Sequence, residues 1–295
     1  MTLNYTEQFE YLRKVIFDDI YRFTGISPES WRAKILEWVV SPPINRFVSI
    51  ATTVDQNVGK YGLIEAARMF IAEYANGLDT MGSENIPVEG PLLIASNHPG
   101  YYDGLAIVAN LPRQDLKVIA GKYPFLTGFQ YLDDILILTA SDMHSKMLAI
   151  RATIQHLQAG GAVLIFPTGT VDPDPAVMPG AENALQNWSP SLELILRKVP
   201  QLQMLVTIIS GMVAPASLKN PLARLRRVPN ERQRVAEFIQ LCQQAFRPHK
   251  LGLVPKVSYS RPFTLADLLN DINPPSLIEG IVQKAEQTLA IHTAR

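Results

Sequence analysis

From residue 92 onward, short apolar runs alternate with stretches of helical periodicity, and this alternation limits the folds open to the chain. Apolar runs of about four to eight residues, bounded by Gly, Pro or polar residues, are typical of buried strands. Helices between such strands form the crossovers of a parallel sheet. We therefore predict an α/β fold, with a mixed, largely parallel sheet flanked by helices. The predicted strands are residues 92–95, 116–120, 135–139, 162–166, 203–209 and about 253–259, and the predicted helices are residues 104–109, 124–131, 142–158, 182–197 and 231–246.

Residues 1–77 have a purely helical pattern and are predicted to form an N-terminal helical module before an α/β domain at residues 78–295. Apolar residues recur every three or four positions through this module. One helix is predicted to begin at Ser27-Pro28-Glu29, because Ser is a good N-cap and Pro suits the first helical position. Pro42-Pro43 is predicted to end it. Two further helices follow, the last over residues 61–76.

Four large aromatic side chains lie on these predicted helices: Phe9, Trp31, Trp38 and Phe70. We interpret them as the core of a helix bundle, because apolar stripes on helices usually face other parts of the protein. Insertion into a membrane surface is the alternative interpretation.

Bulk properties exclude several classes of protein. The 27 Lys and Arg residues balance the 27 Asp and Glu residues, which argues against a nucleic-acid-binding protein. Cys242 is the single cysteine, so an intrachain disulfide and a cysteine-based metal site are both excluded. A length of 295 residues suits one large α/β domain with appended helices.

The distribution of apolar and charged residues indicates the expected cellular location of the protein. Residues 1–18 mix acidic and basic side chains, so we expect neither a secretory signal nor an N-terminal anchor. The longest apolar run, residues 204–216, is shorter than the roughly 20 residues that span a bilayer. We therefore expect a cytoplasmic protein that meets lipid peripherally, at the inner face of a membrane.

The most concentrated chemistry follows the strand predicted at residues 92–95. Pro99-Gly100 forces a turn, which leaves His98 at the end of the strand. Asp103 follows, so that a loop residue and a residue in the first turn of a helix can face each other. A carboxylate bonded to one imidazole nitrogen leaves the other nitrogen to accept a proton. The pair can therefore act as a general base, with a structural histidine that caps the helix as the alternative.

A second predicted strand ends in a similar loop. Residues 162–166 lead into Phe166-Pro167-Thr168-Gly169-Thr170, which combines Pro and Gly with two hydroxyl groups. Because ligands of parallel sheets bind beyond the C-terminal ends of the strands, we expect the two loops to share one site.

These two segments resemble the sequence boxes of the glycerolipid acyltransferase family, which transfers fatty acyl groups onto glycerol 3-phosphate, lysophosphatidate and related acceptors. The family's Asn-His-x4-Asp box is matched by Asn97, His98 and Asp103. Its Phe-Pro-Glu-Gly-Thr box is matched by residues 166–170, except at Thr168. A weaker resemblance extends from about residue 79 to residue 215.

The resemblance implies an O-acyltransferase that moves a fatty acyl group from acyl-CoA or acyl-carrier protein to a hydroxyl of a glycerolipid or related lipid. It makes His98 the general base and Asp103 the residue that orients it. It implies no metal and no cofactor, because the acyl thioester is a co-substrate. The substrate-binding residues expected on this basis are Asn97, Gly100, Tyr101, Lys122, Phe166, Pro167, Thr168, Gly169 and Thr170.

The chain departs from the family at two positions that concern the acceptor. Residues 139–142 lack the Arg that the family places there, and Thr168 replaces a Glu. Asp172, Asp174 and Arg151 are candidates to supply the lost contacts, with a rigid loop and an exposed charge as the alternatives. The sequence therefore indicates the type of reaction more clearly than the identity of the acyl acceptor.

Residues 217–261 are strongly basic, with ten Lys and Arg residues against Glu231 and Glu237. Such a region can bind anionic lipid head groups, an acidic acyl-carrier protein or the phosphates of coenzyme A. A solvated helix surface is the alternative.

Two rival functions come from other classes. A serine hydrolase would need a Gly-x-Ser-x-Gly elbow, which the sequence lacks. A lipid- or acyl-chain-binding protein that retains the acyltransferase fold without the reaction is the second hypothesis.

Overall fold

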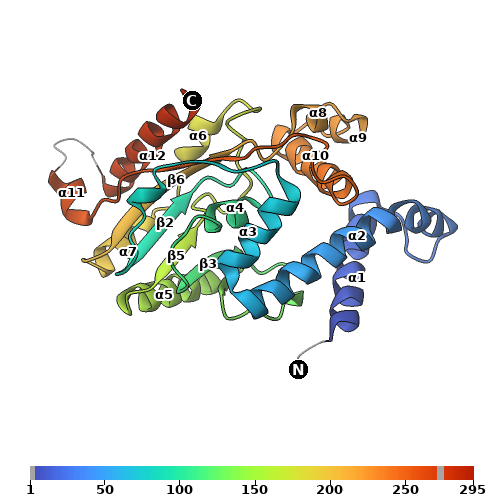
Figure 1. The fold of residues 1–295 in the computed structure, drawn as a ribbon, viewed down its shortest axis with the longest axis horizontal. Helices are drawn as coiled ribbons and strands as arrows, with labels where there is room; N and C mark the ends of the chain where they lie inside the picture. Colours follow the sequence, from blue (N-terminus) through green and yellow to red (C-terminus); the bar gives the residue numbers. More distant parts are fainter. Residues whose placement is uncertain (1–3, 271–275) are drawn as a thin grey trace.

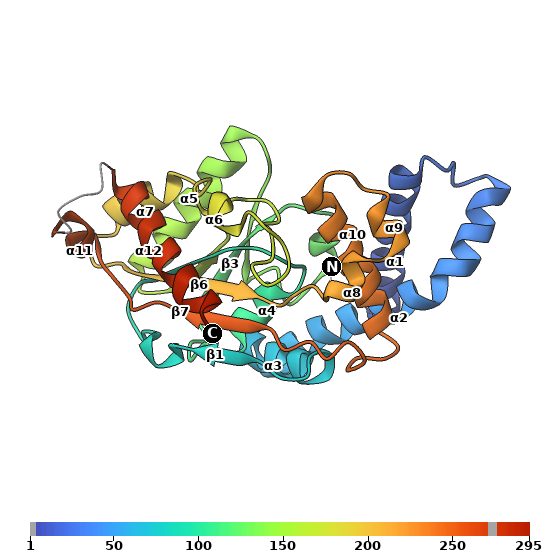
Figure 2. The ribbon, with the colours of Figure 1, turned by 90° about the horizontal axis from the view of Figure 1, so that it is seen from above.

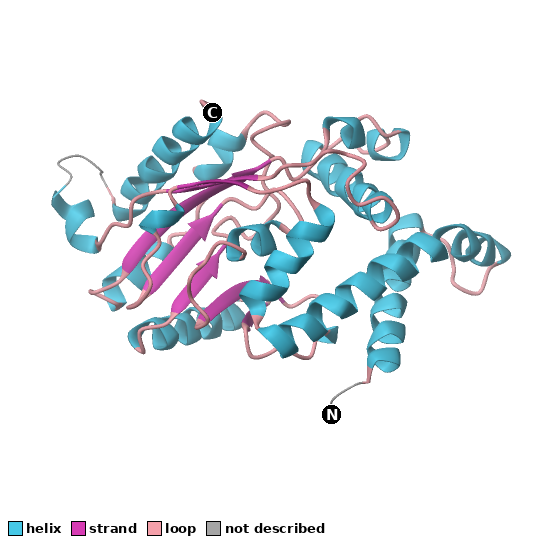
Figure 3. Ribbon diagram, viewed as in Figure 1, coloured by secondary structure: helices cyan, strands magenta, loops and turns pink. Residues whose placement is uncertain are grey.

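The computed structural model describes residues 4–270 and 276–295, and a seven-stranded sheet lies at its centre (Figures 1 and 3). The strands run in the order β1-β7-β6-β2-β5-β3-β4, and every neighbouring pair is parallel except β6 and β7. The predicted α/β class with a mixed, largely parallel sheet is confirmed. The strands are β1 Asp79–Met81, β2 Leu92–Ser96, β3 Leu116–Gly121, β4 Leu136–Thr139, β5 Ala162–Ile165, β6 Gln203–Ser210 and β7 Lys256–Tyr259.

Helices cover both faces of this sheet and extend beyond one end of it (Figure 2). The α-helices are α1 Tyr5–Thr24, α2 Trp31–Tyr61, α3 Leu63–Tyr74, α4 Asp103–Val108, α5 Met143–Gln158, α6 Ala181–Leu185, α7 Ser191–Lys198, α8 Pro215–Leu218, α9 Pro221–Arg224, α10 Pro229–Gln244, α11 Leu265–Asn270 and α12 Leu277–Thr293. Two 3₁₀ turns, η1 Ser83–Asn85 and η2 Leu126–Gly128, complete the set. Within the described residues, no helix is long and apolar enough to cross a membrane.

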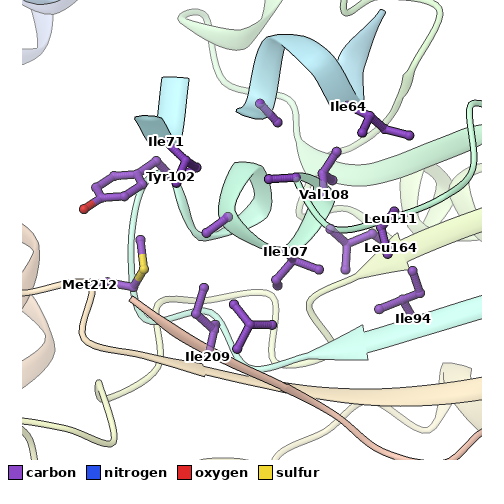
Figure 4. Close-up of a cluster of buried hydrophobic side chains, with 14 of the residues drawn as sticks. Ile64, Ile71, Ile94, Tyr102, Ile107, Val108, Leu111, Leu164, Ile209 and Met212 are labelled. Carbon is purple, nitrogen blue, oxygen red and sulfur yellow. The ribbon is translucent and has the colours of Figure 1, made fainter. Parts of the chain in front are cut away.

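The core is divided by the sheet because successive side chains of a strand point to opposite faces. Leu92 and Ile94 of β2 pack with residues of α3 and α4, in a cluster that also contains Tyr102 and Met212 (Figure 4). Leu93 of β2 packs on the other face, with residues of α7 and α12. Strand β2 is buried on both sides, and its C-terminal end is therefore held rigidly.

The boundary predicted at residue 77 falls in the connection between α3 and β1. Ile64, Ala67 and Ile71 of α3 belong to the same buried cluster as the sheet residues Ile94 and Leu164. The last helix of the N-terminal segment therefore packs directly on the α/β core.

The prediction that Pro42-Pro43 ends a helix is wrong, because α2 runs through both prolines. The prolines cannot donate to the carbonyls of Trp38 and Val39. Trp38 and Val39 lie on an exposed part of the helix, where water can form hydrogen bonds with their carbonyls. Helix α2 changes direction along its length (Figure 2). The helix also begins later than predicted, with Ser30 as the N-cap.

The aromatic side chains of the N-terminal helices divide into two groups. Phe9 and Phe70 pack against buried clusters, as the core interpretation predicts. Trp31 and Trp38 are 67% and 81% exposed, so that interpretation is wrong for them. They lie on the first part of α2, which projects at the end of the molecule (Figure 2).

Three further differences concern short elements. The helix predicted at residues 124–131 is reduced to η2, because the amides of Gln130 and Tyr131 donate to Asp55 of α2. The helix predicted at residues 182–197 is interrupted, since Pro190 lacks an amide hydrogen. Strand β1 was not predicted, because three residues are too few to show a pattern.

Candidate active site

The two sequence boxes come together because their strands are neighbours. Strands β2 and β5 are parallel, and Ala95 is in register with Ile165. The loops that follow them therefore leave the sheet at the same edge. There Phe166 stacks on His98, with ring centroids 4.3 Å apart.

The His98–Asp103 pair is formed. The His98 Nδ1 atom lies 2.8 Å from Asp103 Oδ2. Asp103, at the start of α4, is 1% exposed, and its carboxylate also accepts the amide hydrogens of Gly100 and Gly104, at 3.0 and 2.7 Å. These backbone donors fix the carboxylate, which in turn fixes the imidazole ring.

The hydrogen bond to Asp103 also determines which nitrogen of His98 is available. A carboxylate only accepts, so Nδ1 carries the proton and Nε2 has a lone pair. The His98 side chain is 29% exposed, which leaves it open to a reactant. Burial lowers the pKa of His98, but the charges of Asp103 and Asp172 outweigh it and raise that pKa above its ordinary value.

Asp172 connects the two loops directly. Its carboxylate accepts the amide hydrogen of His98 at 2.9 Å, and its own amide donates to the His98 carbonyl at 2.8 Å. Asp174 is fully buried and accepts amide hydrogens from Gly211, Met212 and Val213 after β6. Asp174 therefore holds loops together, and the suggestion that it contacts an acceptor is wrong.

Helix α10 forms one side of the site, which the sequence analysis did not predict. Gln233 donates from Nε2 to the carbonyls of Pro99 and Asp172, at 2.7 and 2.9 Å. Glu237 accepts the amide hydrogen of Tyr101 at 2.5 Å. Both side chains are fully buried, so α10 holds the loop that carries His98 from behind.

The remaining polar side chains on this face of α10 extend the same contact. Gln240 accepts from the Ala214 amide and donates to the Met212 carbonyl, at 2.8 Å in both cases. Gln244 donates to the Tyr74 carbonyl at the end of α3. A sequence signal was present, because Gln233, Glu237, Gln240 and Gln244 recur at the three- and four-residue spacing of one helix face. Such polar residues ordinarily indicate a solvated face.

The predicted substrate-binding residues occupy different surroundings. The amide of Asn97 is buried and exchanges two hydrogen bonds with the backbone of Ile209, so Asn97 lies behind the site. A Cβ atom on Gly100 would lie 2.6 Å from the Glu237 carboxylate, so this glycine permits the close approach of α10. Tyr101 is 52% exposed. Lys122 is exposed just after β3, at the same edge of the sheet.

The second box forms a tight loop. Pro167 is buried, and Gly169 adopts a φ of 66°, which only Gly adopts readily. The Thr168 hydroxyl donates to the Thr170 carbonyl at 3.0 Å and is therefore used within the loop. Thr170 is exposed, and its hydroxyl makes no hydrogen bond to any part of the chain that the structure describes.

Asp142, in the segment that lacks the family's Arg, has a local structural role, whereas Arg151 makes no ion pair in the described part of the chain that would assign it one. Asp142 caps α5 and accepts the amide hydrogen of Ser145 at 2.9 Å. Arg151 is exposed on α5 and forms no ion pair within residues 4–270 and 276–295. Over those same residues, no group of three His, Cys, Asp or Glu side chains could hold a metal ion.

Comparison with known proteins identifies the central part of the chain. Residues 78–190, which contain both boxes, match the family model named Acyltransferase. The chain carries an acyltransferase domain. The prediction of an acyltransferase is thereby confirmed for this part of the chain. Helix α10 lies outside the matched residues of this acyltransferase domain, although it holds the loop that carries His98.

The solved structures that this chain resembles include one described as the 1-acyl-sn-glycerophosphate (LPA) acyltransferase, PlsC, from Thermotoga maritima. The TM-score is 0.47 and the sequence identity is 15%, over 99% of this chain and 95% of that one. No curated protein matches the sequence.

Proposed function

We propose that the acyltransferase domain transfers a fatty acyl group from an acyl thioester to a hydroxyl of a glycerolipid or related lipid acceptor. The observation that carries the proposal is the 2.8 Å contact between His98 Nδ1 and Asp103, at the strand edge where the two boxes meet. The family match over residues 78–190 supports the same reaction class.

The geometry supports a direct transfer without a protein nucleophile. His98 Nε2 takes the proton of the acceptor hydroxyl while that oxygen forms a bond to the thioester carbon. The carbon–sulfur bond then breaks, and the departing thiolate takes the proton back from the imidazolium. Asp103 stabilises the imidazolium between these steps. Backbone amides of the two loops and the Thr170 hydroxyl are the proposed donors to the oxyanion.

The donor is acyl-CoA or an acyl-carrier protein, and the basic residues 217–261 are proposed to contact its phosphates or its acidic surface. For the acceptor, we propose a lipid reached from a membrane surface. The exposed Trp31 and Trp38 on α2 support peripheral contact with such a surface.

The test is acyl transfer by the wild type and by His98→Ala, with acyl-CoA or acyl-carrier protein as donor and a lipid extract as acceptor. Mass spectrometry of the lipids identifies any product. We expect His98→Ala to lower turnover by about 10²–10⁴-fold, the usual contribution of a general base. Turnover at the wild-type rate in the variant would refute the mechanism. Binding of the acyl thioester without turnover by the wild type would instead indicate a lipid-binding protein.

A further inference from the structure

Helix α10 brings one exposed cation to the catalytic loop. Gln233 and Glu237 contact the backbone of Pro99 and Tyr101, so the segment between them lies against the loop that carries His98. Arg234 lies in this segment, and unlike its buried neighbours it is exposed. Its backbone position is fixed by the two anchors, and its exposed guanidinium interacts with the Tyr101 phenol of the same loop.

The charge of Arg234 acts on the catalytic residues. It lowers the pKa of His98, against the effect of Asp103 and Asp172, and it also opposes the effect of burial on the Tyr101 phenol. No carboxylate in the described part of the chain forms an ion pair with Arg234. By contrast, Arg232 on the same helix donates to the Leu218 carbonyl. Arg234 is therefore a cation near His98 that forms no ion pair with the described residues, although its charge also lowers the pKa of the buried Glu237.

We propose that Arg234 binds a phosphate group of a substrate beside His98. A guanidinium presents several donors in a plane and suits phosphate oxygens better than a single ammonium group does. The inference rests on the proposed acyl transfer, whose donor carries phosphates and whose acceptor is phosphorylated in many glycerolipids. The shared chemistry is a phosphate ester, from either the donor or the acceptor.

The position of Arg234 couples binding to the base. A bound phosphate neutralises the guanidinium, which then lowers the pKa of His98 less. His98 becomes a stronger base in the substrate complex than in the free enzyme. The acidic limb of kcat should therefore lie at a higher pH than that of kcat/KM, since these two profiles report the complex and the free enzyme respectively.

The test compares Arg234→Gln and Arg234→Lys with the wild type, and uses Lys198→Gln as the control that also removes one positive charge. Lys198 is exposed at the end of α7 and forms no ion pair within the described residues. We expect Arg234→Gln to raise the KM of the phosphate-bearing substrate about tenfold, as for one charge-assisted hydrogen bond, with a smaller effect on kcat. Arg234→Lys should recover part of this loss. In Arg234→Gln, the acidic limbs of kcat and kcat/KM should lie closer together in pH than in the wild type.

Two substrate pairs distinguish the source of the phosphate. An acyl-N-acetylcysteamine thioester lacks the phosphates of acyl-CoA, and a monoacylglycerol lacks the phosphate of lysophosphatidate. The effect of Arg234→Gln should vanish with whichever substrate has lost the group that Arg234 binds. An unchanged KM for every substrate, or an equal loss in Lys198→Gln, would overturn the inference.

Binding measurements separate this inference from the proposed reaction. If the wild type shows no turnover, the proposed function is refuted. Calorimetric titration of the wild type and Arg234→Gln with acyl-CoA and with lysophosphatidate then still tests whether Arg234 binds a phosphate group. A weaker affinity of Arg234→Gln for either compound supports the phosphate site, and equal affinities for both refute it.

Discussion

His98 takes its chemical character from side chains that are far apart in the sequence. Asp103 fixes the ring from the same loop, Phe166 and Asp172 contact the histidine from the loop after β5, and Arg234 acts from α10. The two carboxylates raise the pKa of His98, whereas Arg234 and burial lower it. The basicity of His98 is therefore a balance that single substitutions can shift in either direction.

The charge of Asp172 can be removed with little change in shape. In Asp172→Asn, the amide oxygen can still accept the hydrogen of the His98 amide, but the negative charge is lost. Because that charge raises the pKa of His98, the variant should have a lower pKa at this base. Activity that requires neutral His98 should then persist to lower pH than in the wild type. The measurement is kcat/KM against pH, and an acidic limb that stays in place or moves to higher pH would contradict the expectation.

The sequence predicted the partner of His98 within its own loop and could not predict the role of Asp172. A His and an Asp five residues apart are constrained by a short loop, so their meeting follows from local geometry. Asp172 meets His98 only because β2 and β5 are adjacent, which depends on strand order. The sequence suggested Thr168 and Asp172 as substrate contacts, because a loop sequence does not specify which side chains turn back onto a backbone, as these two do.

At the scale of elements, α10 shows why part of the site could not be predicted. Its polar face follows the helical period clearly, but a row of Gln and Glu is ordinarily interpreted as solvated. These side chains are buried because loop backbones, which need hydrogen-bond partners, lie against them. The strands were easier to predict, since a run of apolar residues in the sequence directly indicates a buried strand. Helix α2 was predicted to end at its proline pair, which breaks most helices. On an exposed helix face, the lost hydrogen bonds destabilise the helix less than in a buried one, because water replaces them.

The carboxyl group of Glu237 should make stability depend on pH. Burial raises the pKa of Glu237 well above its ordinary value, so the folded protein favours the neutral acid. The contribution of Glu237 to the free energy of unfolding is fully present below the ordinary carboxyl pKa. It is lost as the pH rises through the raised pKa of Glu237 in the folded protein. Glu237→Gln keeps an acceptor for the Tyr101 amide and cannot ionise.

We therefore expect the melting temperature of Glu237→Gln to fall less than that of the wild type between pH 5 and pH 9. Thermal unfolding across this range provides the measurement. Asp172→Asn provides a comparison, because burial also raises the pKa of Asp172. Parallel pH profiles for Glu237→Gln and the wild type would show that Glu237 is already ionised in the folded protein.

At the scale of the whole molecule, helices α1, α2, α8, α9 and α10 lie at one end (Figure 2). Helix α10 packs against α2, and the Arg226 guanidinium lies 3.8 Å from the ring centroid of Phe23 at the end of α1. The sheet edge that carries His98 faces the same end, because α10 contacts both the loop that carries His98 and α2. A membrane bound at this end would therefore lie on the side of the molecule that carries the site.

This arrangement predicts that Trp31 and Trp38 contribute to binding of lipid vesicles but not to folding. Both side chains are largely exposed, so the double variant Trp31→Ser, Trp38→Ser should keep the wild-type melting temperature. Transfer of an exposed aromatic ring into a bilayer interface is favourable, and its loss should weaken binding about tenfold or more. Co-sedimentation with vesicles of phosphatidylcholine and phosphatidylglycerol measures this affinity.

The matched control for that prediction is Ile291→Ser, which removes an exposed apolar side chain on α12, a helix that lies apart from α1 and α2 (Figure 1). It should leave vesicle binding unchanged. Turnover of short-chain substrates in solution should be similar in all three proteins, because neither substitution touches His98 or its partners. Equal vesicle binding by the double variant and the wild type would exclude the first part of α2 as the contact. A loss of binding together with normal turnover in solution would show that this part of α2 brings the site to its lipid acceptor without taking part in the chemistry.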